Sequence, residues 1–312
     1  MAERILVTGG SGYIGSVLVP ELLACGYRVT VMDSFVHRQN SLAHVCHDKA
    51  LDLVNADVRD TETLTRLVGE ADIIVPLAAI VGAPACDRDP IAAEAINRDA
   101  IIKMIKVLSP DQFVAMPITN SGYGIGKPGA FCTEESPLCP ISLYGRTKVD
   151  AEAAVLEFGN AVSLRLATVF GMSPRMRLDL LVNDFVYRAV NDGALVLFEA
   201  HFKRNYLHVR DVAGAFLHAI SHQSEMRGRP FNVGLSEANL SKRELCERIQ
   251  KQLPGFAFLE AAFAEDPDKR DYIVSNVRME ATGWRPNHSL DDGIAELIKG
   301  FRMLRNTQYT NL

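Results

Sequence analysis

The sequence has few cysteines and places none of them at the spacing of a metal site. Its six cysteines are scattered over 312 residues, without a CxxC pair and without a histidine at zinc-ligand spacing. We therefore expect reduced thiols and no bound metal. Reduced thiols are typical of a cytoplasmic protein.

The chain also lacks an excess of charge of one sign and any long apolar run. It has 33 Lys and Arg against 38 Asp and Glu, for a formal net charge of -5. This balance gives no support to nucleic-acid binding, so a partner with phosphates would be met by a few placed cations or by backbone N–H groups. No run reaches membrane-spanning length, and Met1 leads directly into a strand-like stretch. We expect an unprocessed cytoplasmic protein that does not contact membranes.

The first half of the chain alternates apolar, β-branched runs with helical patterns. The pattern predicts strands at 4–8, 27–32, 51–55, 73–77, 113–116 and 161–166, and helices at 12–24, 61–69, 90–108 and from about 142. This order predicts an α/β fold with a doubly wound parallel sheet between two layers of helices.

The regular alternation ends near residue 170. Stretches rich in Pro, Gly and charge follow, with helical patterns at 178–191, 209–221, 241–252 and 290–304. We predict a first domain at 1–170 and a smaller C-terminal lobe, mainly 171–312, that binds substrate. Residues 205–234 are expected to return to the first domain.

Three glycines follow the first expected strand and precede a helical pattern. Gly9 can form a tight turn, Gly12 lets a diphosphate approach the backbone, and Gly15 permits close packing of helix on strand. The helix N-terminus then offers free N–H groups and a partial positive charge to a phosphate. Asp33 ends the second expected strand, where a carboxylate can accept both hydroxyls of a ribose.

Together these features predict a Rossmann-type dinucleotide site. The carboxylate of Asp33 would repel a 2′-phosphate, which favours NAD over NADP. Arg38 lies close enough in sequence to weaken that preference.

Tyr144 and Lys148 form a YxxxK pair at the start of the long helix expected from about residue 142. This spacing places both side chains on one helical face, where the ammonium can lower the phenol pKa from its usual value of about 10. Such a pair can take a proton from an alcohol while hydride leaves its carbon for nicotinamide. Thr119 and Ser121 follow the strand at 113–116 and can hydrogen-bond the reacting oxygen.

The order of these motifs resembles the extended short-chain dehydrogenase/reductases, in particular their nucleotide-sugar epimerase/dehydratase branch. The motifs are GGSGYIG at 9–15, TNSGYG at 119–124 and PISLYGRTK at 140–148, and the resemblance covers almost the whole chain. It implies catalysis by Thr119, Tyr144 and Lys148, and a homodimer. The residues implied to bind NAD are Gly9, Gly12, Tyr13, Ile14, Gly15, Asp33, Ser34, Asp57, Val58, Leu77, Ala78, Ala79, Asn97, Tyr144 and Lys148.

The second half fits the same branch through LVNDF at 181–185, RNYLHVRDVA at 204–213 and FNVG at 231–234. The resemblance implies that the substrate is a nucleoside-diphosphate sugar. Its expected ligands are Ser121, Asn183, Phe198, Arg204 and Arg270. Each arginine could equally be a surface charge, and Phe198 a core side chain.

Two differences from the motifs of this branch exclude some of its reactions. Dehydratases of the branch have Thr-Asp-Glu where this chain has Thr119-Asn120-Ser121, and no cysteine stands just before Tyr123, as in epimerases that form a carbanion. What remains is oxidation of a sugar hydroxyl, most simply at C4, and return of the hydride to the opposite face, with NAD recycled.

Two other kinds of activity stay open. Val81 and Thr168 stand where many 4-epimerases of the branch have Lys and Asn, so a 2-epimerase or a 4-ketoreductase using the same residues is an alternative. A non-catalytic NAD-binding regulator would be expected to have lost part of the catalytic set. That set is complete here, which disfavours the regulator.

Overall fold

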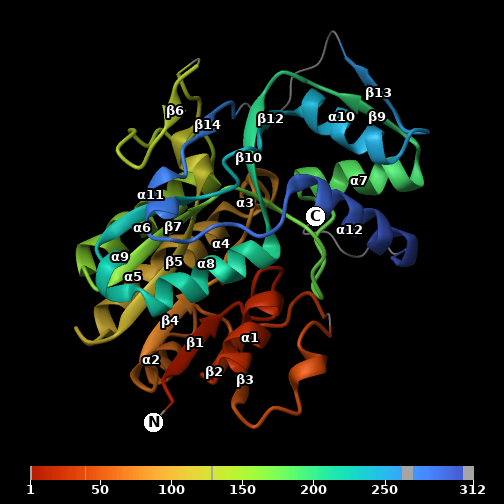
Figure 1. Ribbon diagram of the computed structural model, residues 1–312. Coiled ribbons are helices and arrows are strands. Elements are labelled where there is room, and N and C mark those ends of the chain that lie inside the picture. The colour runs from red at the N-terminus through yellow and green to blue at the C-terminus, as the bar shows by residue number, and fades with distance from the viewer. Residues whose placement is uncertain (1, 39, 128, 262–269, 305–312) are drawn as a thin grey trace.

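The computed structural model describes residues 2–38, 40–127, 129–261 and 270–304, and its centre is one parallel sheet (Figure 1). The seven strands lie in the order β11 (Arg229–Val233), β7 (Ala161–Leu166), β5 (Phe113–Thr119), β4 (Ile73–Pro76), β1 (Arg4–Thr8), β2 (Arg28–Asp33) and β3 (Leu51–Asn55). The strand order reverses between β1 and β4, where open α/β sheets bind their ligands.

Helices cover both faces of this sheet. One face carries α1 (Gly15–Ala24) and α8 (Val209–Ser221), which pack against each other, and the other carries α2 (Thr61–Gly69), α5 (Ala100–Val107) and α6 (Leu143–Phe158). The sheet residues alternate between two hydrophobic clusters, since Ile5 and Val7 face the α1 side and Leu6 faces the α2 side. The predicted Rossmann-type α/β fold is confirmed.

The expected helix at 90–108 is interrupted. It consists of α4 (Pro90–Glu94), a π-helical turn at Ala95–Asp99 and α5, and it is preceded by the short helix α3 (Ala83–Arg88). A π-turn inserts one residue into the helical register. The inserted turn carries Asn97, whose side chain is buried.

Strand β5 is longer than the sequence pattern suggested, because Pro117 does not end it. β5 pairs with β4 only through Phe113 and Val114, but with β7 as far as Thr119. The missing N–H of proline therefore removes no hydrogen bond on the β4 side. The extension places Thr119 at the carboxyl end of a central strand.

The C-terminal half contributes to the main sheet and to smaller ones. β11 is an edge strand of the main sheet, and β8 (Thr168–Phe170), β10 (Lys203–His208) and β12 (Asn239–Ser241) form a separate sheet. Two further pairs are β9 (Ala194–Leu197) with β13 (Ala257–Glu260), and β6 (Phe131–Cys132) with β14 (Ile273–Val274). How the chain divides into domains stays a prediction.

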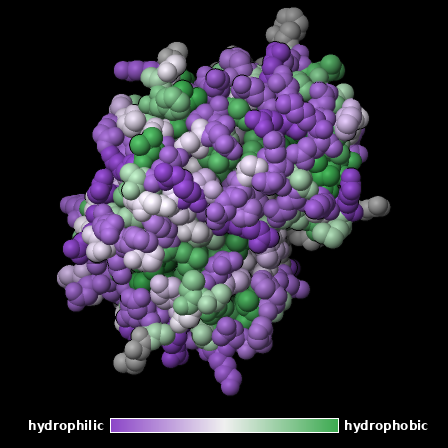
Figure 2. Space-filling model, viewed as in Figure 1, coloured by the Kyte–Doolittle hydropathy of each residue, from purple (hydrophilic) through white to green (hydrophobic). Residues whose placement is uncertain are grey.

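The remaining helices of this half are α7 (Leu181–Asn191), α9 (Gln223–Met226), α10 (Lys242–Gln252), α11 (Val277–Ala281) and α12 (Leu290–Met303). α7, α10 and α12 lie with β9 and β13 beyond the carboxyl end of the main sheet (Figure 1). Hydrophilic residues cover most of the face seen in Figure 2, with small hydrophobic areas among them. None of the described helices is long and apolar enough to cross a membrane.

Candidate active site

The glycine-rich turn lies between β1 and α1 and touches the end of β4. Gly9 has a φ of +69°, and a Cβ there would stand 2.6 Å from the backbone nitrogen of Ala78. A Cβ on Gly15 would lie 2.5 Å from the Cα of Gly10. α1 begins at Gly15 with Ile14 as its N-cap, so the turn is longer than the sequence pattern suggested. Leu77 and the two alanines after it are partly buried beside this turn.

Asp33 ends β2 beside this turn. Its carboxylate accepts hydrogen bonds from the backbone N–H of Ser11 (3.0 Å) and of Phe35 (2.8 Å). Ser11, Gly12 and Asp33 line a small pocket with Phe35, His37 and Arg38. The pocket has the place and the acceptor expected for a ribose site, and Ser34 is exposed next to it.

Asp57 and Val58 follow β3 at the same edge of the sheet. The carboxylate of Asp57 accepts two bonds from the Arg59 guanidinium, at 2.8 and 2.7 Å. These hydrogen bonds hold the Asp57 pKa below its usual value. Val58 is buried. Asp57 is thus held in place near the sheet edge by Arg59, with the apolar side chain of Val58 next to it.

Asn97 fixes the loop after β4. Its amide nitrogen donates to the carbonyl of Ile80 (2.9 Å), and its amide oxygen accepts from the N–H of the same residue (2.8 Å). A longer contact, 3.4 Å, joins the nitrogen to Thr147 in α6. Asn97 therefore positions the loop that contacts the glycine-rich turn, and it binds that loop to the helix of Tyr144.

Tyr144 and Lys148 lie in the first half of α6, as the spacing predicted. Ser142 caps this helix by accepting the N–H of Gly145 at 3.1 Å. Tyr144 is partly exposed, whereas Lys148 is only 4% exposed. Next to the helix, the Thr119 hydroxyl donates to the Ser121 hydroxyl (2.8 Å) and accepts the Ser121 N–H (3.1 Å).

The charges around Tyr144 differ from the sequence-based expectation. Burial raises its pKa to about 12, and the cations that oppose this rise are Arg177 and Arg270. Burial also lowers the pKa of Lys148 to about 8, against the opposing charge of Glu152. Burial thus outweighs the favourable charges at Tyr144 in the chain alone, and the expected lowering of its pKa by Lys148 stays a prediction.

Arg270, just before β14, reaches the catalytic strand end. Its Nη1 donates to the hydroxyl oxygen of Ser121. The structure thus places Arg270 beside the expected reacting group, although the resemblance implied a role at the diphosphate. Arg204 is 3% exposed, donates to the carbonyl of Lys203 at 2.9 Å and lies over the ring of Tyr272.

Asn183 and Phe198 lie in different surroundings. The Asn183 amide is fully buried, accepts the N–H of Gly171 (3.0 Å) and donates to the Tyr13 hydroxyl (3.2 Å) and the Arg177 carbonyl (2.9 Å). These bonds make Asn183 a positioning residue, and contact with a diphosphate stays a prediction. Phe198 is 40% exposed, so it is not a core side chain, and stacking on a base stays a prediction.

Three residues near the site were missed by the sequence analysis. Arg175 and Arg177 are 1% and 7% exposed on the loop after β8. Asn120 is 1% exposed, and neither atom of its amide group has a partner among the described residues. Isolated arginines are usually surface residues, so the sequence alone did not mark Arg175 and Arg177 as buried. A recognised motif that includes them would have been needed to predict a place near the site.

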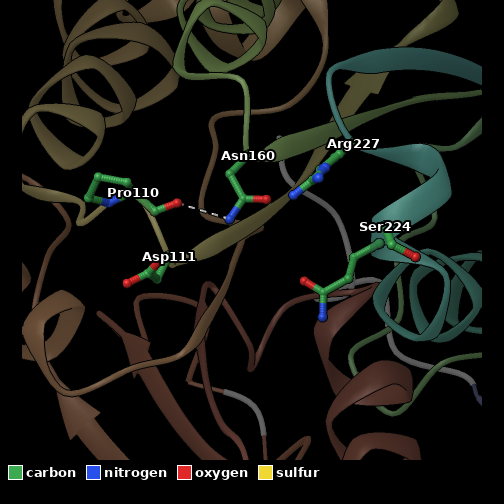
Figure 3. Close-up of a pocket in the computed structure, with 6 residues that line it drawn as sticks. Pro110, Asp111, Asn160, Ser224 and Arg227 are labelled. Atoms are coloured by element: carbon green, nitrogen blue, oxygen red, sulfur yellow. Dashed lines mark hydrogen bonds between the residues drawn. The ribbon is translucent and has the colours of Figure 1, made fainter.

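A larger hollow lies at the opposite edge of the sheet, where Pro110 and Asp111 precede β5 and Asn160 precedes β7 (Figure 3). Asn160 donates to the Pro110 carbonyl at 3.2 Å, and Ser224 in α9 and Arg227 just after α9 also line the hollow. Its two charged residues are exposed. The amino edge of the sheet has neither the glycine-rich turn nor the YxxxK pair, so we place the active site at the carboxyl edge.

Comparison with known proteins shows the family of this chain. The family described as the NAD dependent epimerase/dehydratase family matches residues 5–234. The UDP-glucose 4-epimerase of Mycolicibacterium smegmatis is 29% identical over 312 residues, covering 96% of this chain and 98% of that protein. UDP-glucuronic acid decarboxylase 1 of Arabidopsis thaliana is 26% identical over 314 residues, 96% of this chain and 70% of that protein.

A solved structure extends the comparison to a third activity. DesIV, a dTDP-glucose 4,6-dehydratase of Streptomyces venezuelae crystallised with NAD and TYD bound, superposes with a TM-score of 0.84 at 26% identity, over 97% of this chain and 98% of that chain. Proteins named as epimerases, decarboxylases and dehydratases are thus similar to this chain over nearly its whole length.

Proposed function

The chain belongs to the NAD dependent epimerase/dehydratase family, and from this premise we propose that it is a nucleotide-sugar 4-epimerase. It is an NAD-dependent enzyme of that family. The proposed reaction oxidises the C4 hydroxyl of the bound sugar and reduces the resulting ketone from the opposite face.

The residues at the dinucleotide site fit NAD. The glycine-rich turn packs closely at the start of α1, because Cβ atoms on Gly9 and Gly15 would collide with Ala78 and Gly10. The N–H groups at the N-terminus of α1 suit a diphosphate. Asp33 provides a carboxylate at the end of β2 for ribose hydroxyls. When bound, NAD accepts a hydride from the sugar carbon and returns it.

The observation that carries the proposal is the chemistry at the end of β5. Thr119 and Ser121 present hydroxyls, and Asn120 between them presents an amide, where the dehydratases that the chain resembles have Asp and Glu. Hydroxyls and amides can hold a sugar but do not supply an acid and a base for eliminating water. Tyr144 and Lys148 remain as the proton-transfer groups.

The chain's own residues account for the proton transfers. As its phenolate, Tyr144 takes the proton of the C4 hydroxyl while the sugar is oxidised, and the resulting phenol returns that proton to the oxygen as the ketone is reduced. The charges of Arg177 and Arg270 stabilise its phenolate, opposing the raised pKa. The Thr119 hydroxyl hydrogen-bonds the same sugar oxygen and so fixes its position.

An unsatisfied amide lies next to Thr119 and Ser121 at the end of β5. Asn120 is buried without a protein partner among the described residues, and such groups are usually satisfied by a ligand or water. A sugar hydroxyl can both donate to it and accept from it. We assign the sugar to the space beside Asn120, Ser121 and Arg270, and a nucleoside diphosphate to the C-terminal lobe.

We also propose that the protein is a cytoplasmic homodimer that pairs through α6. Val149, Ala153 and Leu156 form a stripe on this helix, and each of them is partly or largely exposed in the single chain. A second copy would cover the stripe.

Proton NMR of the purified protein with uridine hexoses in deuterated water tests the activity. The 4-epimerase proposal predicts conversion to the C4 epimer, without solvent deuterium in the sugar and without net NADH. Conversion at C2, or reduction of added 4-keto sugars with NADH but no epimerisation, would replace it by the corresponding 2-epimerase or 4-ketoreductase.

A further inference from the structure

The loop from Gly171 to Arg177, which follows β8, is bound to the glycine-rich turn. The Tyr13 hydroxyl donates to the carbonyl of Gly171 at 2.6 Å, and the Ser173 hydroxyl donates to the carbonyl of Tyr13 at 2.7 Å. Tyr13 and Ser173 are both buried. The loop, which belongs to the C-terminal half of the chain, is therefore held against the glycine-rich turn.

A second set of bonds fixes this loop against the first turn of α1. The hydroxyls of Ser16 and Ser173 lie 2.9 Å apart, and the backbone N–H of Arg175 donates to the Ser16 hydroxyl at 3.3 Å. Ser16 is the second residue of α1. The backbone of Arg175 thus lies beside the helix terminus whose N–H groups suit a phosphate.

The side chain of Arg175 is among the largest fully buried ones in the protein. Its Nη1 donates to the carbonyl of Met176 at 3.1 Å. Burial lowers its pKa to about 10, the charge of Arg177 adds to this, and the carboxylates of Asp179 and Asp33 oppose it. The guanidinium is thus still charged at neutral pH, in surroundings where a further anion would stabilise it.

Arg177, two residues later, has a carboxylate partner within the loop. Its Nε and Nη2 donate to the two oxygens of Asp179, at 3.2 and 2.5 Å. The charges of Asp179 and Asp33 act on Arg175, and the charge of Arg177 acts on Tyr144.

We propose that Arg175 is a cofactor-binding residue that contacts the phosphates of the dinucleotide beside the N-terminus of α1. The turn provides N–H groups and about half a positive charge to a diphosphate. A guanidinium adds a full charge and can donate two parallel hydrogen bonds to phosphate oxygens. Through Arg175, the C-terminal half of the chain takes part in binding NAD, whichever sugar reacts.

Fluorescence titration of the full-length chain, freed of bound dinucleotide, tests this role. Arg175→Gln should weaken NADH binding about tenfold or more, since a charge-assisted contact to phosphate is lost. Adenosine has no phosphate, so its affinity, measured by competition with NADH, should be the same in Arg175→Gln and the unmodified protein. Arg175→Lys keeps the charge but loses the bidentate geometry, so its NADH affinity should lie between those of Arg175→Gln and the unmodified protein. Arg28→Gln, an exposed substitution at the opposite end of β2, is the control and should change neither affinity.

Two outcomes would overturn the proposal. Unchanged NADH affinity in Arg175→Gln would show that the guanidinium does not contact the phosphates. An equal loss of NADH and adenosine binding would show that Arg175 only maintains the shape of the pocket. If the Gln variant does not fold, the same comparison of NADH with adenosine in Arg175→Lys decides between these results.

Discussion

Arg165 and Glu152 meet beneath α6 in two parallel hydrogen bonds, Nε to Oε1 and Nη2 to Oε2, each 2.9 Å long. Their side chains are 6% and 3% exposed. Arg165 also donates to the Tyr123 hydroxyl at 3.1 Å, and Tyr123 donates to the amide oxygen of Asn232 at 2.7 Å. The pair thus connects the helix of the YxxxK motif, the turn after Thr119 and strand β11.

Removing one member of this buried pair should be strongly destabilising. Arg165→Met leaves the carboxylate of Glu152 buried without its cation, and we expect the free energy of unfolding to fall by about 3–5 kcal/mol. Urea unfolding measures the change. Arg66→Met removes an exposed ion pair with Glu70 and should lower the free energy by less than about 0.5 kcal/mol. Similar losses in both variants would contradict this account of the pair.

Alanine substitutions at Gly9 and Gly26 distinguish the cost of backbone strain from the cost of a collision with another segment of backbone. Both have positive φ, +69° and +86°, but only at Gly9 would a Cβ meet another backbone, that of Ala78. Gly26→Ala should therefore cost about 1 kcal/mol of stability and leave NADH binding unchanged. Gly9→Ala should cost more and weaken NADH binding, as measured by thermal unfolding and fluorescence titration. Equal effects of the two substitutions would be evidence against the close contact.

Tyr144→Phe removes the proposed proton-transfer group and little else. We expect turnover to fall by about 10²–10⁴-fold, the usual contribution of general acid–base catalysis, with NADH affinity within about twofold of the unmodified protein. Thr119→Val, which removes the neighbouring hydroxyl, should lower turnover less. Retention of full turnover by Tyr144→Phe would rule out Tyr144 as the acid and base.

The pKa of Lys148 predicts a pH dependence of stability. Burial lowers it to about 8 from 10.5, so between these values the unfolded chain binds more protons than the folded one. Stability should therefore rise with pH in this window, by up to about 1.4 kcal/mol per pH unit from this group. The free energies of unfolding of the unmodified protein and of Lys148→Met should be compared below pH 10. Above pH 10 the raised pKa of Tyr144 makes stability fall with pH, which opposes the effect of Lys148. Parallel stability curves for the two proteins would show that Lys148 is not perturbed.

The sequence predicted six of the seven strands of the main sheet, because most of them are short apolar runs buried on both faces. The edge strand β11 was not predicted as a strand, and the other edge strand, β3, is largely exposed. The register of β1 with β2 and β4, for example, joins residues that the pattern had already identified as strands. The extent of β5 was wrong because a proline ends a strand only where its N–H is needed, and that depends on how far β4 extends. Short strands such as β6 and β14 have too few residues to show a period.

The site was predictable where residues lie close in sequence. The glycine-rich turn and the YxxxK pair have spacings that follow from one turn and one helix. Arg175 was not predicted, and Arg270 was named only through the family resemblance, because their positions depend on how the C-terminal half contacts the glycine-rich turn and Ser121. The raised pKa of Tyr144 also depends on burial, which the local sequence does not show.

The proposed 4-epimerase reaction requires that the C4 hydrogen leave and return within one active site. UDP-glucose deuterated at C4 tests this requirement, with the product analysed by NMR and mass spectrometry in ordinary water. We expect the C4 epimer to form and to keep its deuterium, because the same hydride leaves and returns. Formation of the epimer with the label replaced by solvent hydrogen would contradict the proposed reaction.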